Sequence, residues 1–394
     1  MINTNFPPWP SFSKEEAKKA QEIILSNKVN YWTGDECRNF ESEFARFSNS
    51  EYAIAVSNGT VAIDLALHAL NIGKGDEVIV TSRTFIASVS CIINAGAKPV
   101  FVDISRNSQN ITPHNILKAI TSKTKAIICV HLAGWPCEMD AIIKIAKKNK
   151  LFVIEDCAQA HGAKYKGKSV GCIGDIGCWS FCQDKIMTTI GEGGMVTTNK
   201  KNLWKRMWAQ KDHGKSYSAV FNKKHPPGFR WLHETFGTNL RMTEIQAAVG
   251  RIQLNKIHQW TKIRNKYQNR IWNIAKNLKG LRVPDFNCDL GCIHAAYKCY
   301  VFVEQEKLKD NWSRNKIIAK LSALGVPCFS GSCSEVYLEK AFENTNFRPK
   351  KRLKNAKELG ETSLMFLVHP TLRKSDIEHT CKAIEEVMEQ AVII

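Results

Sequence analysis

Lys185 is the residue whose type and surroundings most suggest covalent chemistry. It lies in the segment CWSFCQDKIMTTIGEGG, five residues after Ser180, near the end of a strand-like run and before a glycine-rich turn. A primary amine forms a Schiff base with a carbonyl compound and can then carry a proton, as pyridoxal phosphate (PLP) chemistry requires. Ser180 could hold the phosphate of such a cofactor. The alternative is an ordinary surface lysine, which the apolar and aromatic neighbours disfavour.

A carboxylate lies at the end of another strand-like run, LFVIEDC. In an open α/β sheet, side chains at the carboxyl ends of the strands lie on the ligand side. Asp156 is therefore the candidate partner of a protonated pyridine nitrogen, because Glu155 should point to the other side of the strand end. Gln159, in the same segment EDCAQAHG, could contact the ring hydroxyl of the cofactor. A helix cap is the alternative role for an isolated aspartate here.

The segment SNGT, residues 57–60, lies between a strand-like run and a helical pattern. A strand-to-helix turn at Gly59 brings free backbone N–H groups and the positive end of the helix dipole to one point, where a phosphate can bind. Thr60 could add a hydroxyl donor. Short glycine turns before helices are common, so a plain turn with an N-cap is the alternative interpretation.

Short apolar runs alternate with helical patterns from about residue 51 to residue 200. Fully apolar strands separated by helices are typical of a mainly parallel sheet that is covered on both faces, so a doubly wound α/β domain is predicted. The expected strands are 51–57, 76–82, 99–104, 124–132, 151–157, 178–182 and 193–198, and the expected helices include 60–72, 85–96 and 138–149.

The two ends of the chain have different patterns. A helix is predicted at 14–27, with Ser13 as its N-cap and Glu16 completing a capping box. A long helical stretch at 239–278 leads to a smaller α+β region from residue 295 onward. This region has a strand at 295–306, a helix at 313–325, a strand or turn at 326–331, and a closing helix at 375–390 with Ser375 as its N-cap. The predicted division is an N-terminal segment with the large PLP-binding domain at 1–255 and a small C-terminal domain at 256–394.

The composition disfavours several classes of protein. The formal net charge is +19, with lysines spread along 394 residues, and no patch or motif for nucleic acid is present. No apolar run is long enough to cross a membrane and no secretory signal is recognisable, so a cytoplasmic protein is expected. The 14 scattered cysteines favour buried free thiols. Cys288, Cys292 and His294 have a poor spacing for zinc, and no metal is expected.

The motifs together resemble a known family. SNGT, TFIAS, EDCAQAHGA, GDIGCWSF-x-x-x-K, GEGGM and GTNLRMTEIQAA, in this order and spacing, are similar to the DegT/DnrJ/StrS sugar aminotransferases, over about residues 10–385. The resemblance is closest to perosamine-synthase-like members. It implies an α/β protein of the aspartate aminotransferase fold, PLP-dependent fold type I, with a large mainly parallel-sheet domain and a smaller α+β C-terminal domain. Ile190, before GEGG, departs from the small residue expected there.

The resemblance implies roles around the cofactor ring. Lys185 matches the Schiff-base lysine, and Asp156 matches the residue on the pyridine nitrogen. Gln159 matches the residue near the ring hydroxyl, and Phe85 matches the aromatic residue that stacks on the ring. The implied cofactor is therefore pyridoxal 5'-phosphate.

Four other residues match positions that contact the cofactor phosphate. Gly59, Thr60 and Ser180 match ligands from the same chain. Asn239 matches a residue that reaches the phosphate of the neighbouring subunit, so a homodimer with shared active sites is expected. His131 and Arg241 lie in matching segments, but no role follows for them.

The implied activity is transfer of an amino group, with glutamate as the expected donor, to the keto group of a nucleotide-diphosphate-linked deoxysugar for O-antigen or capsule. One branch of the family has histidine in place of the lysine and performs dehydration, so Lys185 favours transamination. A PLP-dependent sugar dehydratase and a non-catalytic regulatory protein stay open as alternatives. The sequence does not identify the sugar or the carbon that is aminated. Segments expected to shape the sugar pocket are 30–34, 213–217, 225–234 and 329–335.

Overall fold

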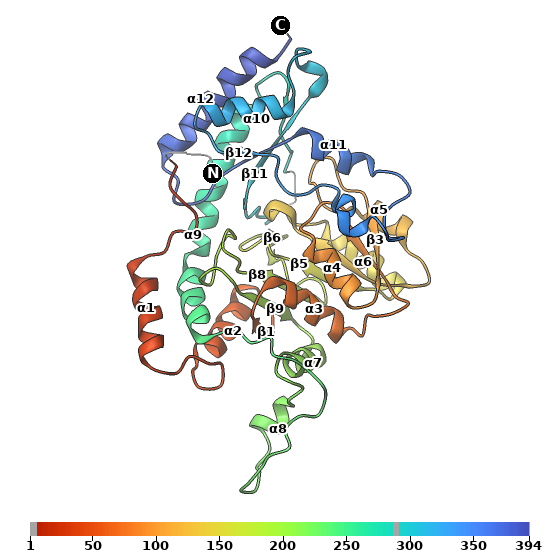
Figure 1. Ribbon diagram of the computed structural model, residues 1–394, viewed down its shortest axis with the longest axis vertical. Coiled ribbons are helices and arrows are strands. Elements are labelled where there is room, and N and C mark those ends of the chain that lie inside the picture. Colours follow the sequence, from red (N-terminus) through yellow and green to blue (C-terminus); the bar gives the residue numbers. More distant parts are fainter. Residues whose placement is uncertain (1–5, 287–290, 394) are drawn as a thin grey trace.

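The computed structural model describes residues 6–286 and 291–393. Figure 1 shows an elongated molecule with a large sheet and its helices at the centre, a smaller sheet above, and a segment around α8 (Tyr217–Phe221) that projects below. The helix α9 (Glu244–Ala275) runs along one side and links the two sheets. Within the two described ranges, no helix combines the length and the apolar character that crossing a membrane would require.

Seven strands form the large sheet in the order β1-β9-β8-β5-β4-β2-β3. β9 is antiparallel to both of its neighbours, and the other neighbouring strands are parallel, so the mainly parallel sheet is confirmed. The strands are β1 (Tyr52–Val56), β2 (Glu77–Thr81), β3 (Lys98–Val102), β4 (Thr124–Val130), β5 (Phe152–Asp156), β8 (Ile176–Ser180) and β9 (Gly194–Thr198).

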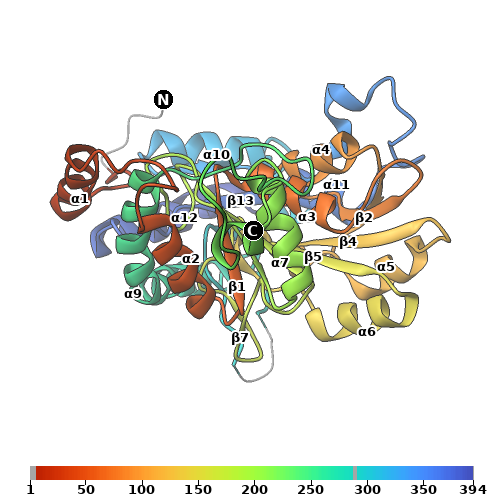
Figure 2. The same cartoon turned by 90° about the horizontal axis from the view of Figure 1, so that it is seen from below.

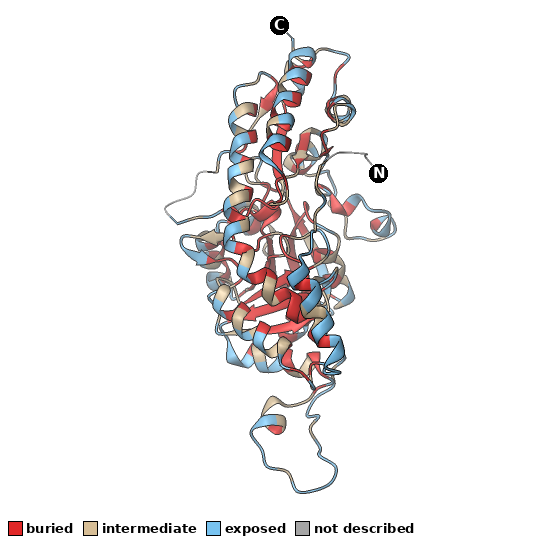
Figure 3. Ribbon diagram, turned by 90° about the vertical axis from the view of Figure 1, so that its left-hand side faces the viewer, coloured by how far each residue is buried: buried red, intermediate tan, exposed pale blue. Residues whose placement is uncertain are grey.

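Helices cover both faces of this sheet, which is why its strands are apolar almost throughout. Successive side chains of a strand point to opposite faces, so Ile79 and Val80 pack into separate clusters. On the face of Val80 lie α3 (Gly59–Ala69), α4 (Ala87–Asn94) and α7 (Lys201–Lys211), and on the other face lie α2 (Glu36–Phe47), α5 (Pro113–Ala119), α6 (Met139–Asn149) and part of α9. Figure 2 shows α3 and α4 on one side of β2, β4 and β5 with α6 on the other, and Figure 3 shows the buried strands between them.

Two predicted helix starts had different outcomes. The capping box of Ser13 and Glu16 is present at α1 (Lys14–Leu25), so that prediction is confirmed. The prediction that Ser375 caps the last helix is wrong, because α12 (Lys374–Ala391) already includes this residue. The carboxylate of Asp376 accepts the backbone N–H of Arg373 at 2.7 Å and pairs with its guanidinium, which sets the start of the helix earlier.

Among the described residues, five α-helices had no prediction: α2, α5, α7, α8 and α11 (Lys354–Thr362). For α2 a signal was available, since its buried residues Cys37, Phe40 and Phe44 are three and four positions apart, the spacing of one helical face. The charged residues between them obscure this pattern.

The smaller sheet is antiparallel, in the order β10-β11-β13-β12. Its elements are β10 (Leu281–Arg282), β11 (Cys299–Val303), β12 (Cys328–Phe329) and β13 (Ser363–Phe366), with α10 (Arg314–Ala323) and α12 packed beside them. The helix α9 spans the predicted boundary at 255/256, with Leu254 and Ile257 in the core of the large sheet and Ile271 in that of the small one. The division into two domains therefore stays a prediction.

Candidate active site at the carboxyl edge of the large sheet

The carboxyl ends of β5 and β8 bring two predicted site residues to the same edge of the sheet. Asp156 is the last residue of β5 and Ser180 is the last residue of β8, and the two strands are parallel neighbours. Ligands of open α/β sheets bind at this edge. The N-terminus of α3 reaches the same place, because Gly59 lies directly against Ser180.

The turn at the start of α3 has the form of a phosphate cradle. A Cβ atom at Gly59 would lie 2.5 Å from the Cβ of Ser180, so only glycine leaves room here. Asn58 is the N-cap, and its side chain accepts the N–H of Val61 at 3.0 Å. The N–H groups of Gly59 and Thr60 stand at the free N-terminus of the helix, where the dipole favours an anion. The residues present therefore fit a phosphate group.

Asp156 is only 6% exposed and is held at both oxygens. Its Oδ2 accepts the hydroxyl of Ser88 at 2.7 Å, and its Oδ1 accepts the backbone N–H of Ala158 at 3.1 Å. A carboxylate with two such bonds still has lone pairs for another donor. The alternative role as a helix cap is wrong, because the element that follows β5 in the described chain is the strand β6 (Lys164–Tyr165). Asp156 could therefore accept a ring N–H.

Glu155 points to the other side of the strand end, as predicted. Its carboxylate accepts the backbone N–H groups of Gly171, Ile173 and Gly174 at 2.9, 2.8 and 2.6 Å. The Nε2 of His131, which follows β4, lies 3.0 Å from the same carboxylate. Glu155 thus ties the loop before β8 to the ends of β4 and β5, and His131 has a structural role that the sequence did not reveal.

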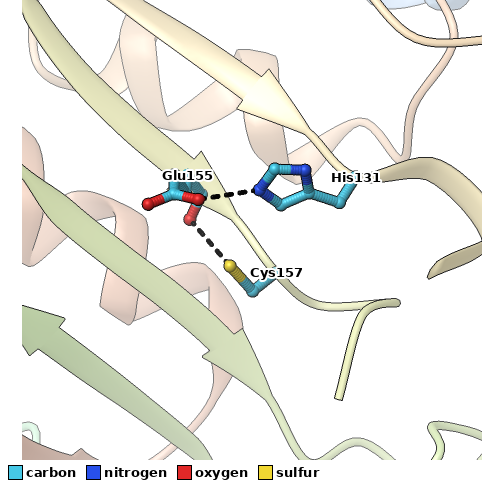
Figure 4. A group of neighbouring side chains, drawn as sticks. All are labelled: His131, Glu155 and Cys157. Carbon is cyan, nitrogen blue, oxygen red and sulfur yellow. Dashed lines mark hydrogen bonds and ion pairs between the residues drawn. The ribbon is translucent and has the colours of Figure 1, made fainter. Parts of the chain in front are cut away.

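His131, Glu155 and Cys157 are close enough to one another to hold a metal ion, as Figure 4 shows. Their ligand atoms are already in use. The Nδ1 of His131 accepts the N–H of Cys137 at 3.0 Å, so its Nε2 carries the proton and donates to Glu155. Burial, and then the charge of Glu155, raise the pKa of the Cys157 thiol well above its ordinary value. Metal ligands must be deprotonated, so this group is a buried hydrogen-bond network.

Replacing Glu155 by glutamine is expected to lower the free energy of unfolding by about 3 kcal/mol, because an amide NH2 would face backbone N–H groups. Burial raises the pKa of Glu155, but His131 and the backbone N–H groups outweigh this and hold it below its ordinary 4.5. The stabilisation is therefore complete above that value and is lost as the pH falls through the folded-state pKa.

Urea unfolding of wild type and Glu155→Gln at neutral and acid pH measures both effects. The difference between the two proteins should shrink in acid. Glu51→Gln is the matched control, because Glu51 is exposed. Equal urea midpoints for Glu155→Gln and wild type at neutral pH would show that this network does not stabilise the fold.

Lys185 lies half-buried in the loop between β8 and β9. Its carbonyl oxygen accepts the indole N–H of Trp9 at 2.8 Å, so the N-terminal segment holds this loop. Its Nζ lies 5.4 Å from the centre of the Tyr297 ring. Among the described residues, no hydrogen bond or ion pair engages this Nζ. The amine is therefore open for covalent chemistry.

Three residues around this lysine were not predicted. The hydroxyl of Tyr297 donates to the carboxylate of Asp184 at 2.5 Å. The Nζ of Lys298 lies 3.9 Å from the same carboxylate and 4.8 Å from the centre of the Tyr297 ring. Burial lowers the pKa of Lys298 to about 8, although Asp184 opposes the change. No spacing in the sequence relates Tyr297 and Lys298 to Lys185, because they lie directly before β11, more than a hundred positions further along the chain.

Phe85 and Gln159 have side chains available to a ligand. Phe85 is 68% exposed and lies three residues before Ser88, which contacts Asp156. An exposed aromatic ring beside a ligand-binding edge is available for stacking. The Oε1 of Gln159 accepts the N–H of Ala133 at 2.7 Å, which leaves its NH2 group to donate to a ligand.

Asn239 is not brought into the site of its own chain. It is exposed, pairs with Asp212 through an isolated bridge, and forms no described hydrogen bond with Gly59, Thr60 or Ser180. Its bridge to Asp212 closes the base of the segment around α8, which projects below the large sheet in Figure 1. Its predicted role in a neighbouring subunit stays a prediction.

Arg241 connects this projecting segment to the sheet. It pairs with Val56 at the end of β1, and its guanidinium donates to Asp212 at 2.7 Å. Lys215 donates to the same carboxylate at 3.1 Å. Arg241 therefore supports the base of the segment that carries Asn239.

The cysteine prediction needs one correction. Twelve cysteines of the described residues are free thiols, but Cys292 is disulfide-bonded. Cys288 lies outside the described residues. His294 is buried against Trp135, burial lowers its pKa to about 3, and its Nδ1 accepts the N–H of Ala296 at 2.8 Å. The Nδ1 of His294 is thus occupied by a hydrogen bond. The sequence could not predict this bond, because it depends on the local backbone conformation.

Ile190 has a φ of 60°, in the left-handed region. A side chain branched at Cβ is unfavourable there by about 1–2 kcal/mol. The residue lies five positions after Lys185 and is 46% exposed. Glycine, the smallest residue, would relieve the strain because it has no Cβ atom.

Comparisons with known proteins agree with this geometry. The model of the DegT/DnrJ/EryC1/StrS aminotransferase family matches residues 10–385. The chain is 46% identical over 251 residues to GDP-perosamine synthase of Escherichia coli O157:H7, which is 63% of this chain and 65% of that protein. It is 36% identical over 357 residues to GDP-perosamine synthase of Caulobacter vibrioides, covering 89% of each. An aminotransferase structure from Psychrobacter cryohalolentis has a TM-score of 0.95 at 59% identity, with 98% of this chain and 99% of that chain covered. These likenesses confirm the predicted fold class, PLP-dependent fold type I.

Proposed function

Because the chain belongs to the DegT/DnrJ/EryC1/StrS aminotransferase family, we propose that it transfers an amino group from glutamate to the keto group of a nucleotide-linked deoxysugar. The observation that carries this proposal is the meeting of a phosphate cradle and a held carboxylate at one sheet edge, with Lys185 in the loop that leaves β8 at that edge. These are the three groups that a PLP-dependent transaminase needs.

Pyridoxal phosphate, when bound, supplies an electron sink that stabilises negative charge at the carbon that loses its proton. Gly59, Thr60 and Ser180 would hold its phosphate, and Phe85 would pack on its ring. Asp156, already oriented by Ser88, would accept the N–H of the pyridine nitrogen.

Lys185 would attach the cofactor covalently and then move a proton. Once the amino group of the donor has displaced it from the cofactor, its free Nζ would take the proton from the α-carbon of the donor, a transfer that a positioned amine accelerates by about 10²–10⁴-fold. Tyr297 limits the space beside this Nζ, and the Asp184 carboxylate that Tyr297 contacts balances part of the positive charge of Lys298. Trp9 fixes the backbone of the lysine through its carbonyl oxygen.

The acceptor proposal is supported by the relatives and by charge. Both GDP-perosamine synthases carry a nucleotide-linked amino sugar in their names. The formal net charge of +19 would attract the diphosphate of such an acceptor. We assign the product to cell-surface polysaccharide synthesis, and the buried free thiols support a reducing compartment such as the cytoplasm.

The active unit is proposed to be a homodimer. The projecting segment, which lies between the bridged residues Asp212 and Asn239, has three large aromatic side chains that are largely exposed. They are Phe229, Trp231 and Phe236, with exposed fractions of 77%, 85% and 99%. Exposed apolar groups of this size mark protein interfaces. A second copy that covers them would bring Asn239, at the base of the same segment, close to the partner site.

The proposal is tested with protein loaded with pyridoxamine phosphate and a panel of nucleotide-linked 3-keto and 4-keto sugars, read by mass spectrometry. The expected result is a product that carries a new amine for one member of the panel, with glutamate regenerating the loaded protein. A product that has lost oxygen without gaining an amine would instead assign a dehydratase. Failure of every keto sugar to react would favour a regulatory protein.

A further inference from the structure

Two buried hydroxyl groups form a chain that ends on Asp156. Thr84 Oγ1 lies 2.8 Å from Ser88 Oγ, and Ser88 Oγ lies 2.7 Å from Asp156 Oδ2. Thr84 and Ser88 are each 1% exposed, so bulk water does not compete for these bonds. Neither residue belongs to the predicted site.

The direction of donation follows from the chemistry of the groups. An ionised carboxylate only accepts, so Ser88 gives its single hydroxyl proton to Asp156, and Thr84 must then donate to Ser88. Consecutive bonds of this kind strengthen one another in a buried environment. Because Asp156 Oδ1 also accepts the N–H of Ala158, both carboxylate oxygens are held and the side chain cannot rotate.

The segment TFIAS places these groups. Ser88 lies in the first turn of α4, three residues after the exposed Phe85. The backbone N–H of Thr84 donates to the carbonyl oxygen of Cys333 at 3.2 Å, and Ser82 accepts the N–H of Val336 at 3.0 Å. The loop before α4 is thus fixed at two points by the chain after β12.

We propose that Ser88, oriented by Thr84, is a positioning residue that holds Asp156 in the orientation in which it keeps a proton on the pyridine nitrogen of the cofactor. This inference rests on the proposed function. Ser88 acts through Asp156, with which it shares a direct hydrogen bond. Removing its hydroxyl therefore leaves the phosphate cradle and Lys185 intact but lets the carboxylate turn.

The test uses full-length protein and PLP labelled with nitrogen-15 in its ring. In Ser88→Ala, the nitrogen-15 chemical shift of the bound ring should move toward that of an unprotonated pyridine. The kcat should fall about 10-fold, the size expected for one lost hydrogen bond to a charged group, while the KM for the keto sugar stays unchanged. Ser88→Thr keeps the hydroxyl and should restore the wild-type shift.

Two further variants separate this role from a structural one. Ser90→Ala removes a hydroxyl two residues further along α4, on a different side of the helix, and should behave as wild type. Thr84→Val removes the first donor while Ser88 remains, and it should move the nitrogen-15 chemical shift in the same direction by a smaller amount. This variant tests the inference independently if Ser88→Ala does not fold. Nitrogen-15 shifts equal to those of wild type in both Ser88→Ala and Thr84→Val would overturn this inference and leave the proposed function standing. Wild-type protein that binds no PLP would overturn the proposed function, and the inference with it.

Discussion

Lys185→Ala is expected to lose the covalent attachment of PLP and to lower kcat by at least about 10²–10⁴-fold, the contribution of proton transfer alone. The structure explains why no other group should substitute. Among the described residues, the Nζ of Lys185 forms no hydrogen bond or ion pair, whereas the nearby Lys298 is paired with Asp184. Lys185→Arg should be equally inactive, since arginine keeps the positive charge but forms no comparable covalent link.

Reduction with borohydride and peptide mass spectrometry measure the attachment directly. PLP should be found on the peptide that contains Lys185 in wild type and in Lys298→Ala, and on no peptide in Lys185→Ala. Lys201→Ala, at the exposed start of α7, is the matched control for kcat. Label on Lys298 instead of Lys185 would contradict the assignment.

Asp156→Asn is expected to reduce kcat by about 10²–10⁴-fold while the protein still folds and binds PLP. Asparagine has nearly the same shape and can still accept the hydroxyl of Ser88. It lacks the negative charge that stabilises a protonated ring nitrogen. Leaving one member of a buried charge pair without its partner costs about 3–5 kcal/mol, and each 1.36 kcal/mol is about tenfold in rate.

Steady-state kinetics at saturating PLP, with absorbance to confirm loading, measure this loss. Asp140→Asn is the control, because its carboxylate is 65% exposed and pairs with Lys166 on the surface. The loss of kcat in Asp156→Asn should exceed the loss in Ser88→Ala, because Ser88→Ala retains the negative charge of Asp156. A threefold change in kcat corresponds to about 0.7 kcal/mol of activation free energy. If the kcat of Asp156→Asn stays within threefold of wild type, Asp156 has no part in the proposed chemistry.

The sequence was sufficient for the parts of the site that lie next to a regular element. Apolar strands predicted the large sheet, and a parallel sheet places the ends of its strands on one edge. Asp156 and Ser180 end β5 and β8, and Gly59 begins α3, as their places in the sequence suggested. Local capping chemistry also predicted α1, although the same reasoning misplaced the start of α12 by overlooking Asp376.

Contacts between distant segments could not be predicted in this way. Trp9 meets Lys185 across 176 positions, and Tyr297 meets Asp184 across 113. No periodicity encodes such a meeting, because it depends on how the N-terminal segment and β11 pack against the large sheet. The buried role of His131 likewise required the position of Glu155, which comes from a neighbouring strand.

The fold class, the place of Lys185 in the loop after β8 and the glycine turn before α3 were therefore predictable from the sequence alone, since each depends on a local pattern within one element or turn. Only the tertiary structure decided what surrounds them: the hydroxyl chain from Thr84 and Ser88 to Asp156, the tyrosine beside Lys185 and the network at Glu155. The physical reason is that hydrogen bonds between buried side chains are set by three-dimensional packing, and the residues that form them are free to lie anywhere along the chain.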